Sequence, residues 1–115
     1  MSLIYFHNPK CSKSREGLKI LEDSHQDFLK KEYLKEEISY NELDSIVQKL
    51  NLHPREIIRT KEPLFTELKL DKKELSYKEW INVIISNPIL LERPILVSNK
   101  SALIARPPSL ILNFS

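Results

Sequence analysis

The fold of this chain is indicated first by one stretch near the N-terminus, Leu3-Ile4-Tyr5-Phe6-His7-Asn8-Pro9-Lys10-Cys11. Its first four residues are bulky and β-prone, and His7-Asn8-Pro9 is a turn signal. After Cys11, a short polar run leads into a helical pattern over residues 15–24, in which Leu18 and Leu21 share one face. The stretch therefore predicts a strand, a loop and a helix, with the cysteine where the loop meets the helix.

The middle of the chain is predicted to be helical. Residues 28–34 read as a second strand, and then Ser39 and Ser76 each begin an S-x-x-E capping-box sequence. Apolar residues at helical spacing follow both serines, and the second helix is expected to end before Asn87-Pro88. Two shorter helical segments are expected between them, over residues 54–59 and 63–70.

The β pattern returns near the C-terminus. Ile95-Leu96-Val97 and Leu103-Ile104 flank a polar tetrapeptide and read as a hairpin, and Pro107-Pro108 can open a last short helix. The predicted order is β-α-β, a helical insertion, and then β-β-α. By fold analogy this is an α/β, thioredoxin-like order. We expect one such domain over residues 1–115, with the helical insertion at about residues 39–88.

Composition excludes several classes of function. The 115 residues carry 18 basic and 16 acidic side chains, a net charge of +2, which does not indicate a nucleic-acid or membrane partner. Without an apolar run long enough for a membrane span or a signal peptide, a cytoplasmic location is expected. The single glycine, Gly17, excludes glycine-rich phosphate loops, and the three histidines lie too far apart to predict a metal site.

Cys11 is the only cysteine in the chain, so it cannot form an internal disulfide. The unpaired backbone N–H groups at a helix N-terminus favour thiolate over thiol and also attract anions. Lys10, Lys13 and Arg15 add positive charge nearby, and His7 is expected to donate from the other side of the loop. The alternative is a buried structural cysteine, because free cysteine is often buried. If Cys11 does redox chemistry, the second thiol must come from outside the chain.

Three arginines are candidates for binding an oxyanion, because the guanidinium group presents a planar pair of donors. Arg59 ends the segment that starts at Pro54, while Arg93 and Arg106 each directly precede a proline. A residue before proline is restricted to extended geometry, so the direction of its side chain is restricted too. The alternative for each is a solvated or salt-bridged surface arginine.

Four stretches of the sequence follow one another in a familiar order: His7-Asn8-Pro9-Lys10-Cys11-Ser12-Lys13-Ser14-Arg15, residues 55–62, Asn87-Pro88-Ile89-Leu90-Leu91-Glu92-Arg93-Pro94-Ile95, and Ala105-Arg106-Pro107. Together they resemble the arsenate reductases that couple to glutathione and glutaredoxin, in the ArsC family. The resemblance covers essentially the whole chain. The chain departs from the common pattern at Ser12-Lys13-Ser14, where well-characterised members often have Gly-Thr-Ser.

The resemblance implies a role for each site residue. Cys11 would be the nucleophile that attacks arsenate, with His7 helping to keep it ionised. Arg59, Arg93 and Arg106 would bind the oxyanion; Ser14, Arg15 and Pro94 would support the site, with Pro94 as a cis-proline facing the cysteine. The implied electron donors are glutathione, as co-substrate, and glutaredoxin, as protein partner, with no bound cofactor.

Two other functions stay open at this point. The first is a glutathione-dependent thiol-disulfide oxidoreductase with a different substrate, for which a third arginine would have no purpose. The second is an Spx-like transcriptional regulator that binds RNA polymerase. Redox sensors of that kind usually have a C-x-x-C sequence, and position 14 here is a serine.

Overall fold

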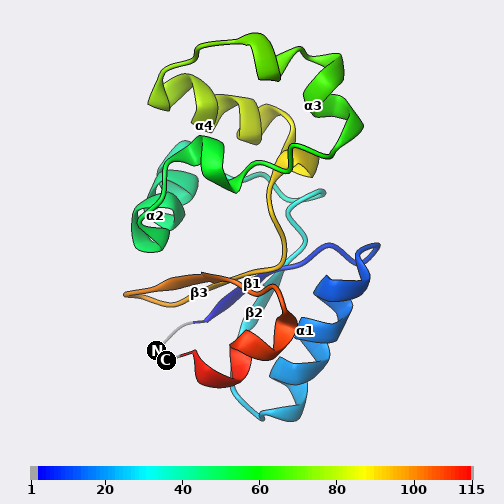
Figure 1. The fold of residues 1–115 in the computed structure, drawn as a ribbon. Helices are drawn as coiled ribbons and strands as arrows, with labels where there is room; N and C mark the ends of the chain where they lie inside the picture. Colours follow the sequence, from blue (N-terminus) through cyan, green and yellow to red (C-terminus); the bar gives the residue numbers. More distant parts are fainter. Residues whose placement is uncertain (1–2, 115) are drawn as a thin grey trace. The chain divides into compact units, whose positions relative to one another are not determined.

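The computed structural model describes residues 3–114, which divide into two compact units (Figure 1). The first contains residues up to Glu36 and those from Arg93 onward, and the second is Glu37–Glu92. The two are described separately below.

The first unit is built on a mixed sheet with strand order β2-β1-β3-β4. Strand β1 (Ile4–Phe6) pairs in parallel with β2 (Leu29–Lys31) and antiparallel with β3 (Ile95–Val97), and β3 pairs antiparallel with β4 (Ala102–Ile104). The parallel pair needs a crossover, which is helix α1 (Ser12–Asp23). The predicted hairpin at residues 95–104 is confirmed.

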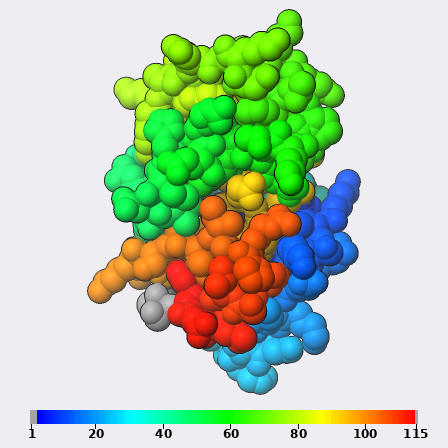
Figure 2. All heavy atoms as spheres, viewed as in Figure 1, coloured from blue at the N-terminus to red at the C-terminus, as the bar shows by residue number. Residues whose placement is uncertain are grey.

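Helix α1 and the C-terminal 3₁₀ helix η4 (Pro108–Asn113) pack against each other on one face of this sheet (Figure 1). Strand residues alternate between faces, so Tyr5 and Leu96, paired across the sheet, point to the same side. There they form one apolar core with Leu21 of α1 and Ile111 of η4. The space-filling view shows η4 (red) beside the β3–β4 hairpin (orange) (Figure 2).

Helix α1 approaches the sheet closely at Gly17, which explains why glycine occupies this position. A Cβ atom at Gly17 would lie 2.2 Å from the hydroxyl oxygen of Tyr5 and 3.1 Å from Cδ1 of Ile111. Both distances are shorter than ordinary van der Waals contact of roughly 3.5–4.0 Å. Gly17 therefore allows the helix to sit close to the buried Tyr5 ring.

The second unit is the helical insertion. It contains helices α2 (Tyr40–Leu50), α3 (Pro63–Glu67) and α4 (Tyr77–Ser86), and the 3₁₀ helices η1 (Pro54–Ile57), η2 (Leu70–Lys72) and η3 (Pro88–Leu90). Helices α2 and α4 pack together through buried residues, among them Leu43, Ile46, Trp80 and Ile84.

Both predicted serine caps are present. The Ser39 side chain accepts a hydrogen bond from the N–H of Glu42, and the Ser76 side chain accepts one from the N–H of Glu79. Glu79 completes a capping box by accepting from the Ser76 N–H, and these hydrogen bonds lower the pKa of its carboxyl group. The sequence pattern thus located the starts of α2 and α4 correctly.

Four predicted boundaries were wrong. Helix α1 begins at Ser12 rather than Arg15, and β2 covers only Leu29–Lys31. The helical segment from Pro54 ends at Ile57, because Ile58 adopts extended geometry and forms a β-bridge with Leu91. The segment from Pro63 breaks at Lys69, whose left-handed backbone (φ 57°) separates α3 from η2.

Candidate functional site

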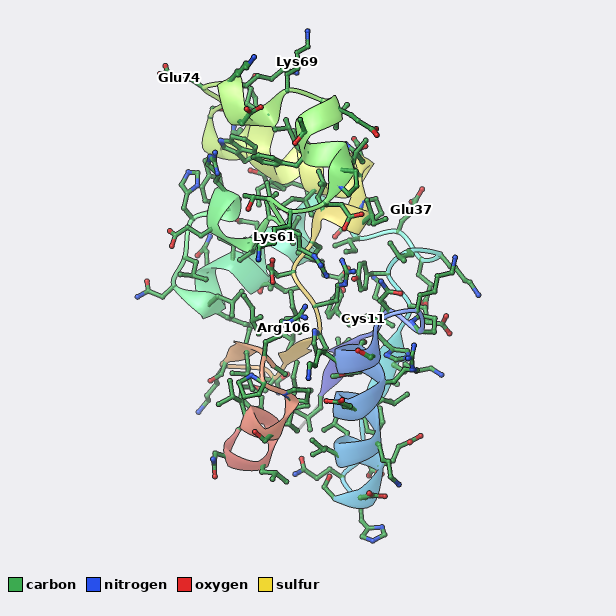
Figure 3. The ribbon with its side chains drawn as sticks, turned by 45° about the vertical axis from the view of Figure 1, so that its right-hand side comes forward. Cys11, Glu37, Lys61, Lys69, Glu74 and Arg106 are labelled. Atoms are coloured by element: carbon green, nitrogen blue, oxygen red, sulfur yellow. The ribbon has the colours of Figure 1, made fainter. Side chains whose placement is uncertain are left out.

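Cys11 is the N-cap residue of α1, with an extended backbone (φ −97°, ψ 123°) and a partly exposed side chain. Its carbonyl accepts the first helical hydrogen bond, from the Arg15 N–H, at 3.0 Å, and its own N–H donates to the Asn8 carbonyl at 3.0 Å. Figure 3 shows Cys11 at the N-terminal end of α1. The sulfur therefore lies beside N–H groups of the first turn that have no partner within the helix.

The electrostatic setting of Cys11 favours the thiolate. Burial raises the pKa of the thiol, but the nearby backbone N–H groups of Ser14 and Lys13 and the Arg93 guanidinium group lower it. The positive charge of Arg93 acts in the same direction, and the net effect is a pKa below the ordinary value. A lowered pKa and partial exposure are what a reactive cysteine needs, and a buried structural cysteine lacks both.

Ser14 connects the loop before Cys11 to the helix after it. Its side chain is fully buried, and its hydroxyl oxygen accepts from the Asn8 N–H at 2.9 Å and lies 2.8 Å from Nδ1 of His7. The Tyr5 hydroxyl donates to the Ser14 carbonyl at 2.7 Å. These contacts attach the first turn of α1 to strand β1, and so fix the backbone around Cys11.

His7 is buried, with 4% of its surface exposed. Burial and the positive charges of Lys30 and Arg15 lower its pKa, which outweighs the opposite effect of Glu32 and Glu22. The ring is therefore mainly neutral at pH 7, and its contact is with Ser14, the residue three positions after Cys11. His7 thus reaches the cysteine loop through Ser14, a link that the sequence did not indicate.

The side chains of Arg15 and Asn8 form hydrogen bonds with the backbone of the loop before Cys11. An NH1 group of Arg15 donates to the Pro9 carbonyl at 2.8 Å, and the Asn8 side-chain oxygen accepts from the Lys10 N–H at 3.0 Å. The sequence predicted a turn at His7-Asn8-Pro9 but not this hydrogen bond of the Asn8 side chain. Both contacts constrain the turn that leads into Cys11.

Arg93 and Arg106 lie in the same unit as Cys11. The Arg93–Pro94 peptide bond is cis, as the resemblance implied, and the Arg106–Pro107 bond is cis as well. An NH1 group of Arg106 donates to the Arg93 carbonyl at 3.1 Å, and the Ala105 N–H donates to the Pro94 carbonyl at 2.9 Å. Figure 3 labels Arg106, which follows strand β4 and is exposed. The end of β4 is thereby attached to the start of β3 at Arg93.

Arg59 belongs to the helical unit. Its N–H donates to the Leu90 carbonyl at 2.7 Å, and the Glu92 N–H donates to the Ile57 carbonyl at 2.9 Å, on either side of the Ile58–Leu91 bridge. Its Nε lies 4.0 Å from the Glu62 carboxylate. The sequence had suggested that Arg59 ends a helix. In the structure, the hydrogen bonds beside the Ile58–Leu91 bridge hold its backbone instead.

The model of the ArsC family matches residues 6–114, nearly the whole described chain. The chain belongs to the ArsC family. The chain is 42% identical, over 97% of both sequences, to a protein of Haemophilus influenzae named arsenate reductase. It is 40% identical to the solved structure of an arsenate reductase from Vibrio cholerae, with a TM-score of 0.93, covering 100% of this chain and 98% of the other.

A regulator is also among the similar proteins. The chain is 30% identical to the global transcriptional regulator Spx 2 of Bacillus cereus, over 85% of this chain and 75% of the regulator.

The thioredoxin-like fold predicted from the element order is confirmed by the sheet order and by the solved arsenate reductase structure that matches over the whole chain. In residues 3–114, no helix is long and apolar enough to cross a membrane.

Proposed function

We propose that this ArsC protein reduces arsenate to arsenite with Cys11 as the nucleophile, glutathione as the reductant and glutaredoxin as the partner. The observation that carries the proposal is the position of Cys11 at the N-cap of α1, where the first-turn N–H groups and Arg93 lower the pKa of the thiol. The same groups that stabilise a thiolate also attract an oxyanion, because both ligands are negative. The names of its relatives in Haemophilus influenzae and Vibrio cholerae support the choice of arsenate.

In the first step the Cys11 thiolate attacks the arsenic atom of hydrogen arsenate. An S–As bond forms and an As–O bond breaks, and two protons convert the departing oxygen to water. Arsenic remains As(V) in this adduct. Arg59, Arg93 and Arg106 bind the oxyanion and withdraw charge from it, and His7 and Ser14 hold the loop that carries the nucleophile.

In the second step a glutathione thiolate attacks the Cys11 sulfur. An S–S bond forms, and the electron pair of the S–As bond passes to arsenic, which leaves as arsenite, As(III). The sulfurs of Cys11 and glutathione are oxidised to a mixed disulfide. Glutaredoxin then takes over the glutathione group and regenerates Cys11, with a second glutathione as the final reductant. A chain with one cysteine needs such external thiols.

A coupled assay tests the proposal. The protein is mixed with arsenate, glutathione, glutaredoxin, glutathione reductase and NADPH, and the arsenate-dependent oxidation of NADPH is followed. We expect turnover in this mixture, and very little when thioredoxin with its reductase replaces the glutathione system. Efficient turnover with thioredoxin as the only thiol source contradicts the glutathione mechanism, and no turnover in either mixture contradicts the arsenate reaction.

A second candidate is a regulator that binds RNA polymerase, favoured by the 30% identity to Spx 2. A regulator of this kind that senses oxidation would need a second cysteine at position 14, where this chain has the buried Ser14. Copurification with RNA polymerase, together with an inactive coupled assay, would favour this candidate. The thiol-disulfide oxidoreductase is favoured instead if the protein reduces mixed disulfides and leaves arsenate unchanged.

A further inference from the structure

A pocket of about 220 Å³ lies next to the loop that carries Cys11, within the sheet unit. Its walls are the loop before the cysteine and the segment that follows strand β2. The lining residues are Asn8, Pro9, Lys10, Glu32, Leu34 and Lys35. One lining residue, Lys10, directly precedes Cys11 in the sequence.

The charged groups around the pocket are two amines and one carboxylate. Lys10 is exposed, and the Lys35 amine is 3.7 Å from the Glu32 carboxylate, with 78% of the Lys35 side chain exposed. Leu34 adds a partly exposed apolar surface, at 38%. A ligand that matches this arrangement carries two carboxylates and one ammonium group on a short, partly apolar backbone.

Glutathione has this set of charges. Its γ-glutamyl end holds an ammonium and a carboxylate on one carbon, which match Glu32 and Lys35, and its glycine carboxylate matches Lys10. An extended tripeptide spans about 10 Å. The pocket is smaller than the roughly 300–1,000 Å³ of sites that enclose a whole small ligand. It therefore fits one end of the tripeptide rather than all of it.

We infer that this Lys10–Lys35 pocket receives the γ-glutamyl end of glutathione when its thiolate attacks the Cys11 sulfur. The inference rests on the proposed function, because it concerns the thiol of its second step. Glutathione would then be distinguished from other small thiols by its charges and not only by its reactivity. A docking face for glutaredoxin is the competing use of the same surface.

The test measures thiol attack on Cys11 without arsenate. Cys11 is converted to its mixed disulfide with 5-thio-2-nitrobenzoate, and release of the coloured thiolate is followed. The incoming thiolate forms an S–S bond with Cys11, and the electron pair of the broken bond leaves on the thionitrobenzoate. Glutathione, γ-glutamylcysteine and cysteinylglycine are compared, each normalised to its rate with Ellman's reagent at the same pH.

We expect glutathione and γ-glutamylcysteine to react about five-fold faster than cysteinylglycine, which lacks the γ-glutamyl end; this is the effect of one largely exposed charge pair. Glu32→Gln and Lys35→Gln should each remove most of this preference. Lys19→Gln is the matched control, because Lys19 is an exposed lysine of α1 that pairs with Asp23 outside the pocket. Circular dichroism confirms that the variants are folded.

The inference is overturned if the three thiols have equal normalised rates with the wild-type protein. It is also overturned if the preference survives Glu32→Gln and Lys35→Gln, or if Lys19→Gln removes it equally. If the pocket variants slow only the removal of glutathione from Cys11 by glutaredoxin, the surface serves the protein partner and the inference is wrong. Because no arsenate is present, these results are independent of whether the protein reduces arsenate.

Discussion

Replacing Gly17 by alanine is expected to destabilise the protein, although alanine is the better helix former. The new Cβ would lie 2.2 Å from the Tyr5 hydroxyl oxygen, which is about 1.3 Å short of ordinary contact. Tyr5 is fully buried, and its hydroxyl donates to the Ser14 carbonyl at 2.7 Å. A displacement large enough to relieve the overlap breaks this hydrogen bond.

The size of the effect follows from three contributions. Overpacking costs about 1–3 kcal/mol, and a buried hydroxyl left without a partner costs about 1–3 kcal/mol. Helix propensity returns about 1 kcal/mol when glycine becomes alanine. We therefore expect the free energy of unfolding to fall by about 3 kcal/mol, measured by urea denaturation.

A double-mutant cycle identifies the cause. Tyr5→Phe removes the hydroxyl, so Gly17→Ala should cost clearly less in the Tyr5→Phe protein than in the wild type. Some cost remains, because Cζ of Tyr5 and Cδ1 of Ile111 would still lie 3.2 and 3.1 Å from the new Cβ. An equal cost in both backgrounds, or no cost in the wild type, would refute the close approach as the reason for glycine at this position.

Three further predictions concern the site. The rate of Cys11 alkylation by iodoacetamide should rise with a midpoint well below a pH of about 8.5, which is the pKa of a free thiol, because the pKa of Cys11 is lowered. A midpoint at about pH 8.5 contradicts the account. Arg59→Ala, Arg93→Ala and Arg106→Ala should each reduce kcat/KM for arsenate by roughly ten- to a hundred-fold, the effect of losing a charge-assisted contact. Only Arg93→Ala should also move the alkylation midpoint to higher pH, and full activity in all three variants would exclude an arsenate site. Burial lowers the pKa of His7 in the folded state. Below the pKa of about 6.5 that His7 has in the unfolded chain, the unfolded chain therefore binds more protons than the folded protein. The free energy of unfolding should then fall as the pH decreases. Urea titrations at pH 7 and pH 5 should show this loss, and His7→Asn should reduce it; an unchanged loss in the variant assigns it to other groups.

The sequence predicted those parts of the fold that local patterns determine. The strand before Cys11, the caps at Ser39 and Ser76, and the hairpin at residues 95–104 all follow from turn signals, capping chemistry and alternation. The boundaries that were wrong depend on partners distant in sequence. Ile58 is extended because it pairs with Leu91, and no local pattern marks that pairing.

The candidate site was also predictable only where local sequence patterns determine it. Cys11 was identifiable from its place between a strand and a helix, and Arg93 and Arg106 from the prolines that follow them. The sequence treats the arginines alike, whereas the structure singles out Arg93 as a group that lowers the pKa of Cys11. The Tyr5–Ser14 and His7–Ser14 contacts were not predictable, because they depend on how closely α1 packs on the sheet.

The central claim is that Cys11 carries out the reduction of arsenate. The most direct test is to quantify arsenite formed from arsenate, with the two arsenic species separated by chromatography, in the presence of glutathione and glutaredoxin. The wild-type protein should form arsenite, and each arsenite should be accompanied by one molecule of glutathione disulfide. Cys11→Ser should form no more than the mixture without protein, because its hydroxyl is almost wholly protonated at neutral pH. Arsenite formation by Cys11→Ser at the wild-type rate, or none by the wild type, would contradict the account.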